Sequence, residues 1–328
     1  MQYQFDCSRE TSKQRANSLR FLDKGIDIPD DLIRAVNEGS ATFLCGAGVS
    51  VRVGLPSFRT LTEGVYGRLG EAWDDEPAER IAIGAEQYDR ALRSLEKRTH
   101  LPKTNSRVRI ATTDLLAMPV PPLPDHLSLL KLSRDADGRP KLITTNFDTL
   151  FEHAAVAGGF PDIPSHCGKA IPRPGGERDY GILHLHGRIG DPILKLEPSD
   201  LVLTSADFGD AYLRDGWASQ YMEDRMRLGT LVLVGYAAED AAMRLLLETL
   251  DADRDRFRDM KSIYAIERGT PDSASLWKAK GITPIEFPDY DAIYATLAEW
   301  ALYAVDPAEY KSSRVRSILT KPAVGAAI

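Results

Sequence analysis

The chain has 328 residues, of which 43% are hydrophobic and 27% are charged, and its mean hydropathy is -0.27. These values are typical of an ordinary soluble globular protein that can bury a sizeable core. The formal net charge of -7 argues against a general nucleic-acid binder, because attraction to phosphates supplies the sequence-independent part of such binding.

Cysteine usage and the hydropathy pattern exclude further classes. The chain has three cysteines and no Cys-x-x-Cys pair, so a disulfide scaffold and a four-cysteine zinc site are both disfavoured. No apolar stretch nears the roughly 18 residues that a membrane span needs, and the first residues are charged rather than signal-like. We therefore expect a cytoplasmic protein with no membrane partner.

Taken in chain order, short apolar runs alternate with helical patterns. A capped helix over 30–38 leads into a strand over 41–45. Helices are also predicted over 147–157 and 240–250, and the remaining strands over 141–144, 180–185, 230–234 and 262–266, with an edge strand over 283–287. This alternation predicts an α/β fold with a Rossmann-like, doubly wound, mainly parallel sheet, in which ligands bind at the carboxyl ends of the strands.

The domain organisation follows from the stretches that interrupt this alternation. We expect one domain over residues 1–305, with a helical insertion over about 71–134 and a second over about 188–229, both covering the ligand end of the sheet. Residues 306–328 are predicted to form a C-terminal tail or the start of a further element. Basic residues between 90 and 109 are interpreted as a solvated helix face, with a docking surface as the alternative.

A glycine turn follows the first buried strand. Gly46 and Gly48 stand one residue apart, which allows a sharp turn and the close approach of a phosphate to the backbone. The dinucleotide fingerprint needs a third glycine where this chain has Val51. On this pattern alone, a nucleotide-binding turn and a tight turn without a ligand are equally favoured.

Polar side chains follow two other predicted strands. Asn146 and Asp148 come after the strand over 141–144, and His186 follows the strand over 180–185. Because parallel strands end at one edge of a sheet, these groups should converge with Ser50 and Arg59 on one crevice. The crevice would then contain an amide, a carboxylate and an imidazole.

The order of these motifs resembles the sirtuin superfamily over about residues 30–270. The chain has Gly-Ala-Gly-Val-Ser from Gly46, Gly-Leu-Pro-Ser-Phe-Arg from Gly54, Thr-Thr-Asn-Phe-Asp from Thr144, and His-Gly at His186. The family's corresponding motifs occur in the same order. The resemblance implies that residues 1–305 form an NAD-binding catalytic domain, with Asn146 and His186 at the ribose next to nicotinamide.

The chain also departs from the protein-deacylating sirtuins. It lacks their zinc module with two cysteine pairs, and Ser57 stands where they have an aspartate. Gly235 and Tyr236 replace the Gly-Thr-Ser that deacylases use around the nucleotide. The Leu-His-Leu-His-Gly segment from Leu183 and the Gly-Tyr-x-x-x-Asp stretch from Gly235 resemble instead the bacterial sirtuin-like NAD hydrolases. Those proteins are antiphage effectors that deplete NAD in an infected cell, a response known as abortive infection.

This resemblance assigns an expected role to each motif. Cleavage between ribose and nicotinamide passes through a transition state with oxocarbenium character, and the ring leaves without an acid. His186, with an ordinary pKa of about 6.5, would be the general base, Asn146 would orient the attacking water or the ribose, and Asp148 would stabilise positive charge. The amides around Ala47 and Gly48 would bind the pyrophosphate, Arg59 would bind phosphate and Phe58 would pack beside nicotinamide. The expected NAD-binding residues are Gly46, Ala47, Gly48, Ser50, Phe58, Arg59, Thr145, Gly187, Gly235 and Tyr236.

Alternative interpretations remain for several of these residues. His186 by itself would be read as an ordinary strand-end histidine, and Asn146 and Asp148 would serve equally as caps of the following helix. His184 lies two residues before His186 and should face the same side of the strand, which invites a metal site, but no cysteine or glutamate set accompanies the pair. No metal is therefore expected.

The sequence leads to one principal functional hypothesis and two alternatives. The principal hypothesis is an NAD+ glycohydrolase (NADase) that releases nicotinamide and ADP-ribose, acting as a homo-oligomer with a separate sensor or activator protein. The alternatives are an NAD-dependent deacylase or ADP-ribosyltransferase, and a non-catalytic subunit that senses NAD or ADP-ribose in an assembly.

Overall fold

A computed structural model describes residues 18–23, 25–100, 106–236 and 261–320. Its centre is a seven-stranded sheet in the order β5-β6-β4-β3-β7-β8-β9, in which every neighbouring pair is parallel. The strands are β3 (Ala41–Cys45), β4 (Lys141–Thr144), β5 (Ser165–Cys167), β6 (Gly181–His184), β7 (Thr230–Val234), β8 (Ile263–Arg268) and β9 (Thr283–Phe287). A separate antiparallel pair joins β1 (Ser18–Arg20) to β2 (Asp27–Pro29).

The strand order determines where a ligand can bind. Without the edge strand β5, the six remaining strands follow the 3-2-1-4-5-6 arrangement of dinucleotide-binding sheets. The chain leaves β3 toward β4 on one side and later returns to β7 on the other side. The loops after β3 and β7 therefore flank the switch point, where such sheets open a crevice.

Helices cover both faces of the sheet, as alternate side chains of each strand require. One face packs Phe43, Leu142 and Val232 against helices, and the other packs Leu44 and Ile143. The helices on the first face are α2 (Asp30–Asn37), α8 (Pro124–Leu132), α9 (Leu150–Ala157) and α14 (Tyr290–Val305). Those on the second face are α10 (Ser205–Phe208), the π-helix η3 (Gly209–Arg214), α11 (Trp217–Leu228) and α13 (Ser273–Ala279). The predicted doubly wound α/β fold is confirmed.

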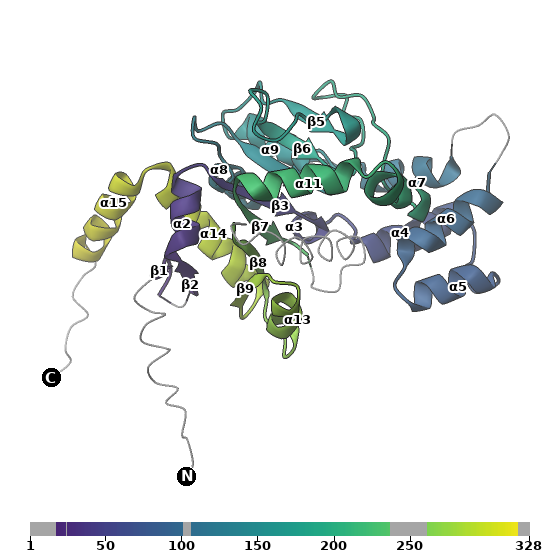
Figure 1. Cartoon of the computed structure of the whole chain (residues 1–328), viewed down its shortest axis with the longest axis horizontal. Helices are drawn as coiled ribbons and strands as arrows, with labels where there is room; N and C mark the ends of the chain where they lie inside the picture. Colours follow the sequence, from purple (N-terminus) through teal and green to yellow (C-terminus); the bar gives the residue numbers. More distant parts are fainter. Residues whose placement is uncertain (1–17, 24, 101–105, 237–260, 321–328) are drawn as a thin grey trace, which may run out of the picture.

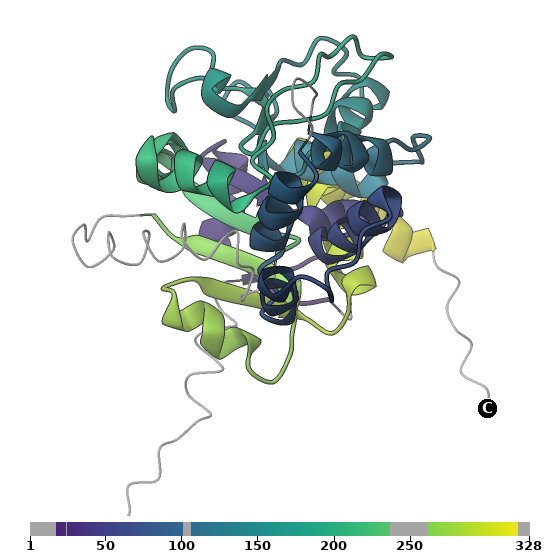
Figure 2. The same ribbon diagram turned by 90° about the vertical axis from the view of Figure 1, so that its right-hand side faces the viewer.

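A group of helices projects from one end of this sheet structure. We call α4 (Phe58–Leu69), α5 (Pro77–Gly84), α6 (Tyr88–Arg98) and α7 (Arg107–Leu116) the helical cap. They gather at one end of the molecule in Figure 1 and lie in front of the sheet in Figure 2. Leu92, Leu95 and Val108 form their own core with Val65 and Tyr66. Helix α8, which the expected insertion over 71–134 included, packs instead against α9 and α14.

Several boundaries differ from the sequence-based expectation. The helix predicted from residue 147 begins at Leu150, because Thr145 to Thr149 form a loop, in which Asn146 and Asp148 bond to Ser50. Strand β5 was not predicted, and Pro307–Thr320 forms a helix, α15, in the segment expected to be a tail or a further element. The helix predicted over 240–250 lies outside the described residues. The short elements α3 (Ala47–Val51) and η2 (Gly168–Ala170) complete the set in the described part of the chain.

Within the described ranges, no helix combines the length and apolar character needed to cross a bilayer.

Candidate active site

A cavity of about 90 Å³ lies at the carboxyl ends of the central strands. The loops after β3, β4, β6 and β7 contribute its polar wall, and the helical cap contributes an apolar wall. Its volume suits one ring-sized part of a dinucleotide rather than the whole molecule. The lining residues are Ala47, Ser50, Leu55, Pro56, Phe58, Leu61, Leu116, Thr145, Asn146, Phe147, Asp148, His186, Val202, Phe208 and Tyr236.

The glycine turn after β3 is held against the end of β7. The amide of Gly46 donates to the carbonyl of Val234 (2.9 Å), and the amide of Gly48 donates to the carbonyl of Gly235 (3.1 Å). A Cβ at Gly48 would lie 2.9 Å from the Gly235 Cα, and one at Gly46 would lie 2.6 Å from the Tyr236 ring. Glycine is required here because two backbones touch. The expectation that the Gly48 amide faces a pyrophosphate is corrected, since that amide is already bonded.

Asn146, Ser50 and Asp148 form a buried chain of hydrogen bonds. The Asn146 Nδ2 donates to the Gly46 carbonyl (3.2 Å) and to the Ser50 Oγ (3.0 Å), and the Ser50 hydroxyl donates to the Asp148 Oδ2 (2.8 Å). Because a carbonyl only accepts, the contact with Gly46 defines which end of the amide is Nδ2. Among the described residues nothing donates to the Asn146 Oδ1, so this oxygen is the part of the amide that a ligand can use.

Asp148 lines the cavity and is also hydrogen-bonded within the protein. Its Oδ1 accepts from the Leu150 amide (3.1 Å), as a residue at the start of a helix does, while its Oδ2 accepts from Ser50. Burial raises the pKa of Asp148, and the hydrogen bonds from Ser50 and Leu150 oppose that rise. Both carboxylate oxygens are thus engaged. The helix-capping interpretation applies to Asp148, whose direct contact with a ligand stays a prediction.

His186 lines the cavity as a buried, neutral side chain. Its Nε2 shares a hydrogen bond of 2.6 Å with the Tyr212 hydroxyl, and the edge of the Phe208 ring lies beside it with 5.2 Å between the ring centroids. Burial lowers the pKa of His186 to about 3. The expected pKa near 6.5 is therefore wrong, because the ring is only 3% exposed and no carboxylate is bonded to it in the described part of the chain.

His184 and His186 point to opposite sides, contrary to the expectation that they share one. His184 Nδ1 contacts the Asn146 carbonyl (2.9 Å), and its Nε2 contacts the Glu152 carboxylate of α9 (2.8 Å). Strand β6 ends at His184, and the Gly187 amide donates to the His184 carbonyl (3.3 Å) across a turn at Leu185 and His186, so the alternation of the strand no longer holds at His186. Burial disfavours a charged His184, but the interaction with Glu152 outweighs it and raises the pKa of His184. The His184–Glu152 pair thus holds the loop of Asn146 through the Asn146 backbone carbonyl.

The other predicted site residues divide into two groups. Thr145 and Tyr236 line the cavity and join hydroxyl to hydroxyl at 2.7 Å, linking the loops after β4 and β7. Ala47, Ser50 and Phe58 also line it. Arg59 does not: its guanidinium bonds to Glu63 (3.1 Å), and its side chain is 64% exposed. Gly187 and Gly235 shape turns, with Gly187 packed against the Asp200 carbonyl.

Ser57, which departs from the deacylase motif, has a local structural role. Its hydroxyl accepts from the Thr60 amide (3.2 Å) and caps the N-terminus of α4. Phe58 then begins the helix and faces the cavity. A serine at this position thus directs the first turn of the helical cap.

The segment 201–212 supplies site residues that the sequence did not reveal. The Val202 amide donates to the His186 carbonyl (2.8 Å), while Phe208 and Tyr212 enclose the imidazole ring. These positions carry no recognisable motif. The only signal was the expectation that residues 188–229 cover the ligand end of the sheet.

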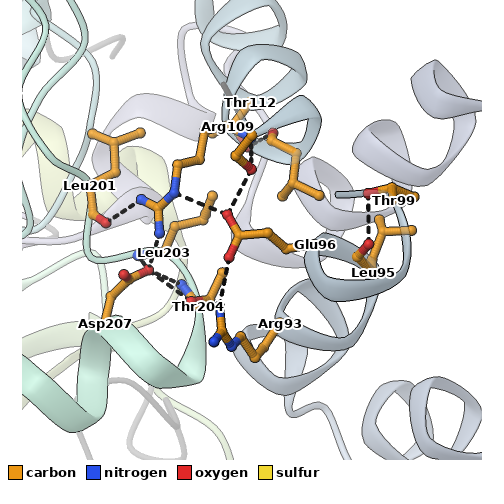
Figure 3. A network of polar contacts seen from close by, with 12 residues as sticks. Arg93, Leu95, Glu96, Thr99, Arg109, Thr112, Leu201, Leu203, Thr204 and Asp207 are labelled. Carbon is orange, nitrogen blue, oxygen red and sulfur yellow. Dashed lines mark hydrogen bonds and ion pairs between the residues drawn. The ribbon is translucent and has the colours of Figure 1, made fainter. Parts of the chain in front are cut away.

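An arginine of the helical cap anchors this segment. Arg109 of α7 donates to the Leu201 carbonyl (2.7 Å), to Asp207 (2.6 Å) and to Glu96 of α6 (3.1 Å), as Figure 3 shows. Asp207 also accepts from the Thr204 amide and directly precedes Phe208. Arg93 and Arg98, from the basic stretch, pair with acidic residues of the cap. The helical cap is therefore tied to the wall that holds His186.

In the described residues, no group of three or more histidine, cysteine, aspartate or glutamate side chains is arranged to hold a metal ion.

A comparison with known protein families supports the resemblance to the sirtuin superfamily. Residues 140–285 match the family model described as the SIR2-like domain. The matched segment holds Asn146, Asp148 and His186, and its similarity to the SIR2-like domain supports the sirtuin superfamily.

The chain is also similar to a curated protein and to a solved structure. The uncharacterized protein y4cA of Sinorhizobium fredii (strain NBRC 101917 / NGR234) is 39% identical over 315 residues, which cover 93% of this chain and 26% of the relative. The chain thus spans about a quarter of the length of that curated relative. A solved structure described as "Structural Basis for the Mechanism and Regulation of Sir2 Enzymes" covers 88% of this chain and 100% of its own, with 15% identity and a TM-score of 0.39.

Proposed function

We propose that this chain binds NAD+ as a substrate and hydrolyses it to nicotinamide and ADP-ribose. One observation carries the proposal: the Asn146–Ser50–Asp148 chain and His186 meet in one cavity at the switch point of a doubly wound sheet. The SIR2-like domain over residues 140–285 supports the choice of NAD+.

The side chains present suit the cleavage of a bond between ribose and a cationic ring. The bonding electrons leave with nicotinamide, which departs neutral, and positive charge develops on the ribose. A neutral His186 does not repel that charge. The buried Asp148 carboxylate, when ionised, favours it through its negative charge.

Asn146 and His186 would then handle the attacking water. The Asn146 Oδ1, held in place by the bonds of Nδ2 to Gly46 and Ser50, accepts a hydrogen bond from the water or from a ribose hydroxyl. The water forms its bond to the ribose and becomes an oxonium group, which is a far stronger acid than water. An imidazole whose pKa is lowered to about 3 is still able to accept that proton.

The apolar wall serves the same reaction. Phe58, Leu61 and Leu116 come from the helical cap and line the cavity together with Phe208 of α10. A flat, weakly polar ring fits among these side chains, while the loops after the strands present the polar groups. Exclusion of bulk water strengthens the electrostatic interactions inside the cavity.

The test is to incubate the purified protein with NAD+, with and without an acylated peptide, and to follow nicotinamide and ADP-ribose. We expect release without peptide, reduced roughly 100- to 10,000-fold in His186→Ala and roughly 100- to 1000-fold in Asn146→Ala. His166→Ala in β5 and Asn37→Ala at the end of α2 are matched controls, since neither residue lines the cavity.

The outcomes separate the three functional hypotheses. Release that strictly requires the peptide would favour a deacylase or ADP-ribosyltransferase. Binding of NAD+ without any release would favour a sensing subunit. A wild-type rate in both cavity variants would contradict the assignment of the site.

The biological setting forms part of the proposal. The motif resemblance supports an NAD-depleting effector of antiphage defence that works in the cytoplasm as a homo-oligomer under a separate activator. Light scattering, combined with NAD+ turnover measured over a range of protein concentrations, tests the oligomer. A turnover rate per chain that does not change with concentration, from a monomer, would count against it.

A further inference from the structure

Tyr212 is the polar partner of the histidine in the cavity. It belongs to the π-helix η3, a rare helical form that recurs at functional sites. Its ring stacks on Phe208 at an interplanar angle of 17°, and its hydroxyl lies 2.6 Å from the His186 Nε2. Tyr212 is 5% exposed. The hydroxyl therefore meets the imidazole inside the protein, away from bulk water.

This contact constrains the chemistry of the imidazole. A neutral imidazole has one N–H donor and one acceptor nitrogen, and a tyrosine hydroxyl is able to pair with either. Since Nε2 is bonded to Tyr212, Nδ1 is the ring nitrogen that remains for a molecule in the cavity. Nδ1 can accept a proton only when Nε2 carries the hydrogen and donates it to the Tyr212 oxygen.

We propose that Tyr212 is a positioning residue that holds the His186 ring in the Nε2–H form, so that Nδ1 is the proton acceptor of the site. This inference rests on the proposed hydrolysis of NAD+. In the step concerned, a water oxygen bonds to the ribose carbon as the bond to nicotinamide breaks. A proton of that water moves to Nδ1, and the imidazolium keeps its Nε2–H donated to Tyr212.

Among the groups around the His186 ring, Tyr212 is the one placed to orient it by a hydrogen bond. Phe208 of α10 and Val202 present apolar groups to the cavity, and Asp148 and Tyr236 are the other titratable groups that line it. The carboxylate of Asp148 is bonded to Ser50 and to the Leu150 amide. His184 and Glu152 pair with each other on the far side of β6, toward α9. No other described residue forms a hydrogen bond with the His186 ring.

The experiment compares the wild type with Tyr212→Phe, which keeps the aromatic ring and removes only the hydroxyl. Two-bond ¹H–¹⁵N spectra report the tautomer of the His186 ring, whose signals are assigned through His186→Ala. Turnover of NAD+ gives kcat and KM, and its pH profile is recorded for both proteins. The matched control is Tyr221→Phe, whose buried hydroxyl bonds to Arg225 on α11 and lies outside the cavity lining.

We expect the Nε2–H tautomer in the wild type and a mixture of tautomers in Tyr212→Phe. We expect kcat to fall roughly 10- to 100-fold, the usual loss when a group that orients a reactive residue is removed, with a displaced acid limb of the pH profile. KM should change by less than about threefold, because the hydroxyl contacts His186 rather than the substrate. Tyr221→Phe should match the wild type in tautomer and kcat.

Several results would overturn the inference. An Nδ1–H tautomer in the wild type or an unchanged kcat in Tyr212→Phe would each do so. A raised kcat would mean that Tyr212 obstructs the reactive nitrogen instead of positioning it. If the wild type does not cleave NAD+ at all, the proposed function fails, and the two tautomer spectra still decide whether Tyr212 orients His186.

Discussion

At the scale of single residues, Ser50 connects the glycine turn to the strand-end motif. The sequence supported only a hydrogen-bonding role for it, because the frame of a hydrolase nucleophile is missing. In the structure its hydroxyl donates to Asp148 and accepts from Asn146. One small side chain from the loop after β3 thus orients two side chains from the loop after β4.

Replacing Ser50 by alanine should weaken both the site and the fold. Asp148 and the Asn146 Nδ2 would each lose a partner, and an unsatisfied buried polar group costs about 1–3 kcal/mol. We expect the free energy of unfolding to fall by about that amount, and kcat for NAD+ cleavage to fall roughly 10- to 100-fold. Denaturant unfolding and steady-state kinetics measure the two effects.

The control for this prediction is Ser128→Ala. Ser128 is a partly exposed serine of α8 that bonds only to the Pro124 carbonyl among the described residues. Surface changes of this kind usually alter stability by less than about 0.5 kcal/mol. A wild-type kcat in Ser50→Ala would show that Asn146 does not depend on this chain of hydrogen bonds.

At the scale of elements, the active-site geometry depends on how α3 packs against the end of β7. Gly235 has a φ of +77° and lies against the backbone of the glycine turn. Val51 stands where the dinucleotide fingerprint has its third glycine. It lies at the exposed end of α3 and does not take part in this contact. The turn uses its two glycines for contact between two backbones.

We predict that Gly48→Ala separates these two elements. Its Cβ would lie 2.9 Å from the Gly235 Cα, so the backbone must shift, and overpacking of this kind costs about 1–3 kcal/mol. The displaced loops after β3 and β7 should also bind NAD+ more weakly, which raises KM. Thermal denaturation and steady-state kinetics measure these changes.

Gly67→Ala is the matched control within a helix. Gly67 lies inside α4, where an added Cβ would meet no atom of the described residues within 4 Å. Alanine there should stabilise the protein by about 0.5–1 kcal/mol, because glycine is a poor helix former. Equal stability changes in both variants would contradict the argument from close packing.

At the scale of the whole molecule, the cavity exists only when distant parts of the chain assemble. Its walls come from the loop after β3, from the loop around Asn146, and from the segment that contains His186 to Phe208. The helical cap completes it, and Arg109 fastens the cap to the segment 201–207. A ligand of this cavity therefore binds the folded chain and not the unfolded one.

This dependence predicts that ADP-ribose, the product, stabilises the protein. At about 100 times its Kd, a ligand that binds only the folded state adds about 2.7 kcal/mol to the free energy of unfolding. A rise in Tm with increasing ADP-ribose concentration measures it without any catalysis. The rise should shrink in Asn146→Ala and persist in Asn37→Ala, and no rise at millimolar ADP-ribose would contradict binding in the cavity.

The sequence by itself determined the sheet and the place of the site. Apolar runs over 41–45, 141–144 and 230–234 predicted their strands, because residues buried on both faces leave a continuous hydrophobic pattern. Parallel strands end at one edge, so Asn146, Asp148 and His186 could be expected to converge.

Only the tertiary structure decided how these groups act. The opposite directions of His184 and His186 depend on the turn from His184 to Gly187, and the exposed pairing of Arg59 depends on Glu63 one helical turn away. The low pKa of His186 and its bond to Tyr212 arise from burial and from a segment distant in sequence. Contacts between distant segments leave no periodicity in the chain, so strand and helix patterns alone do not reveal them.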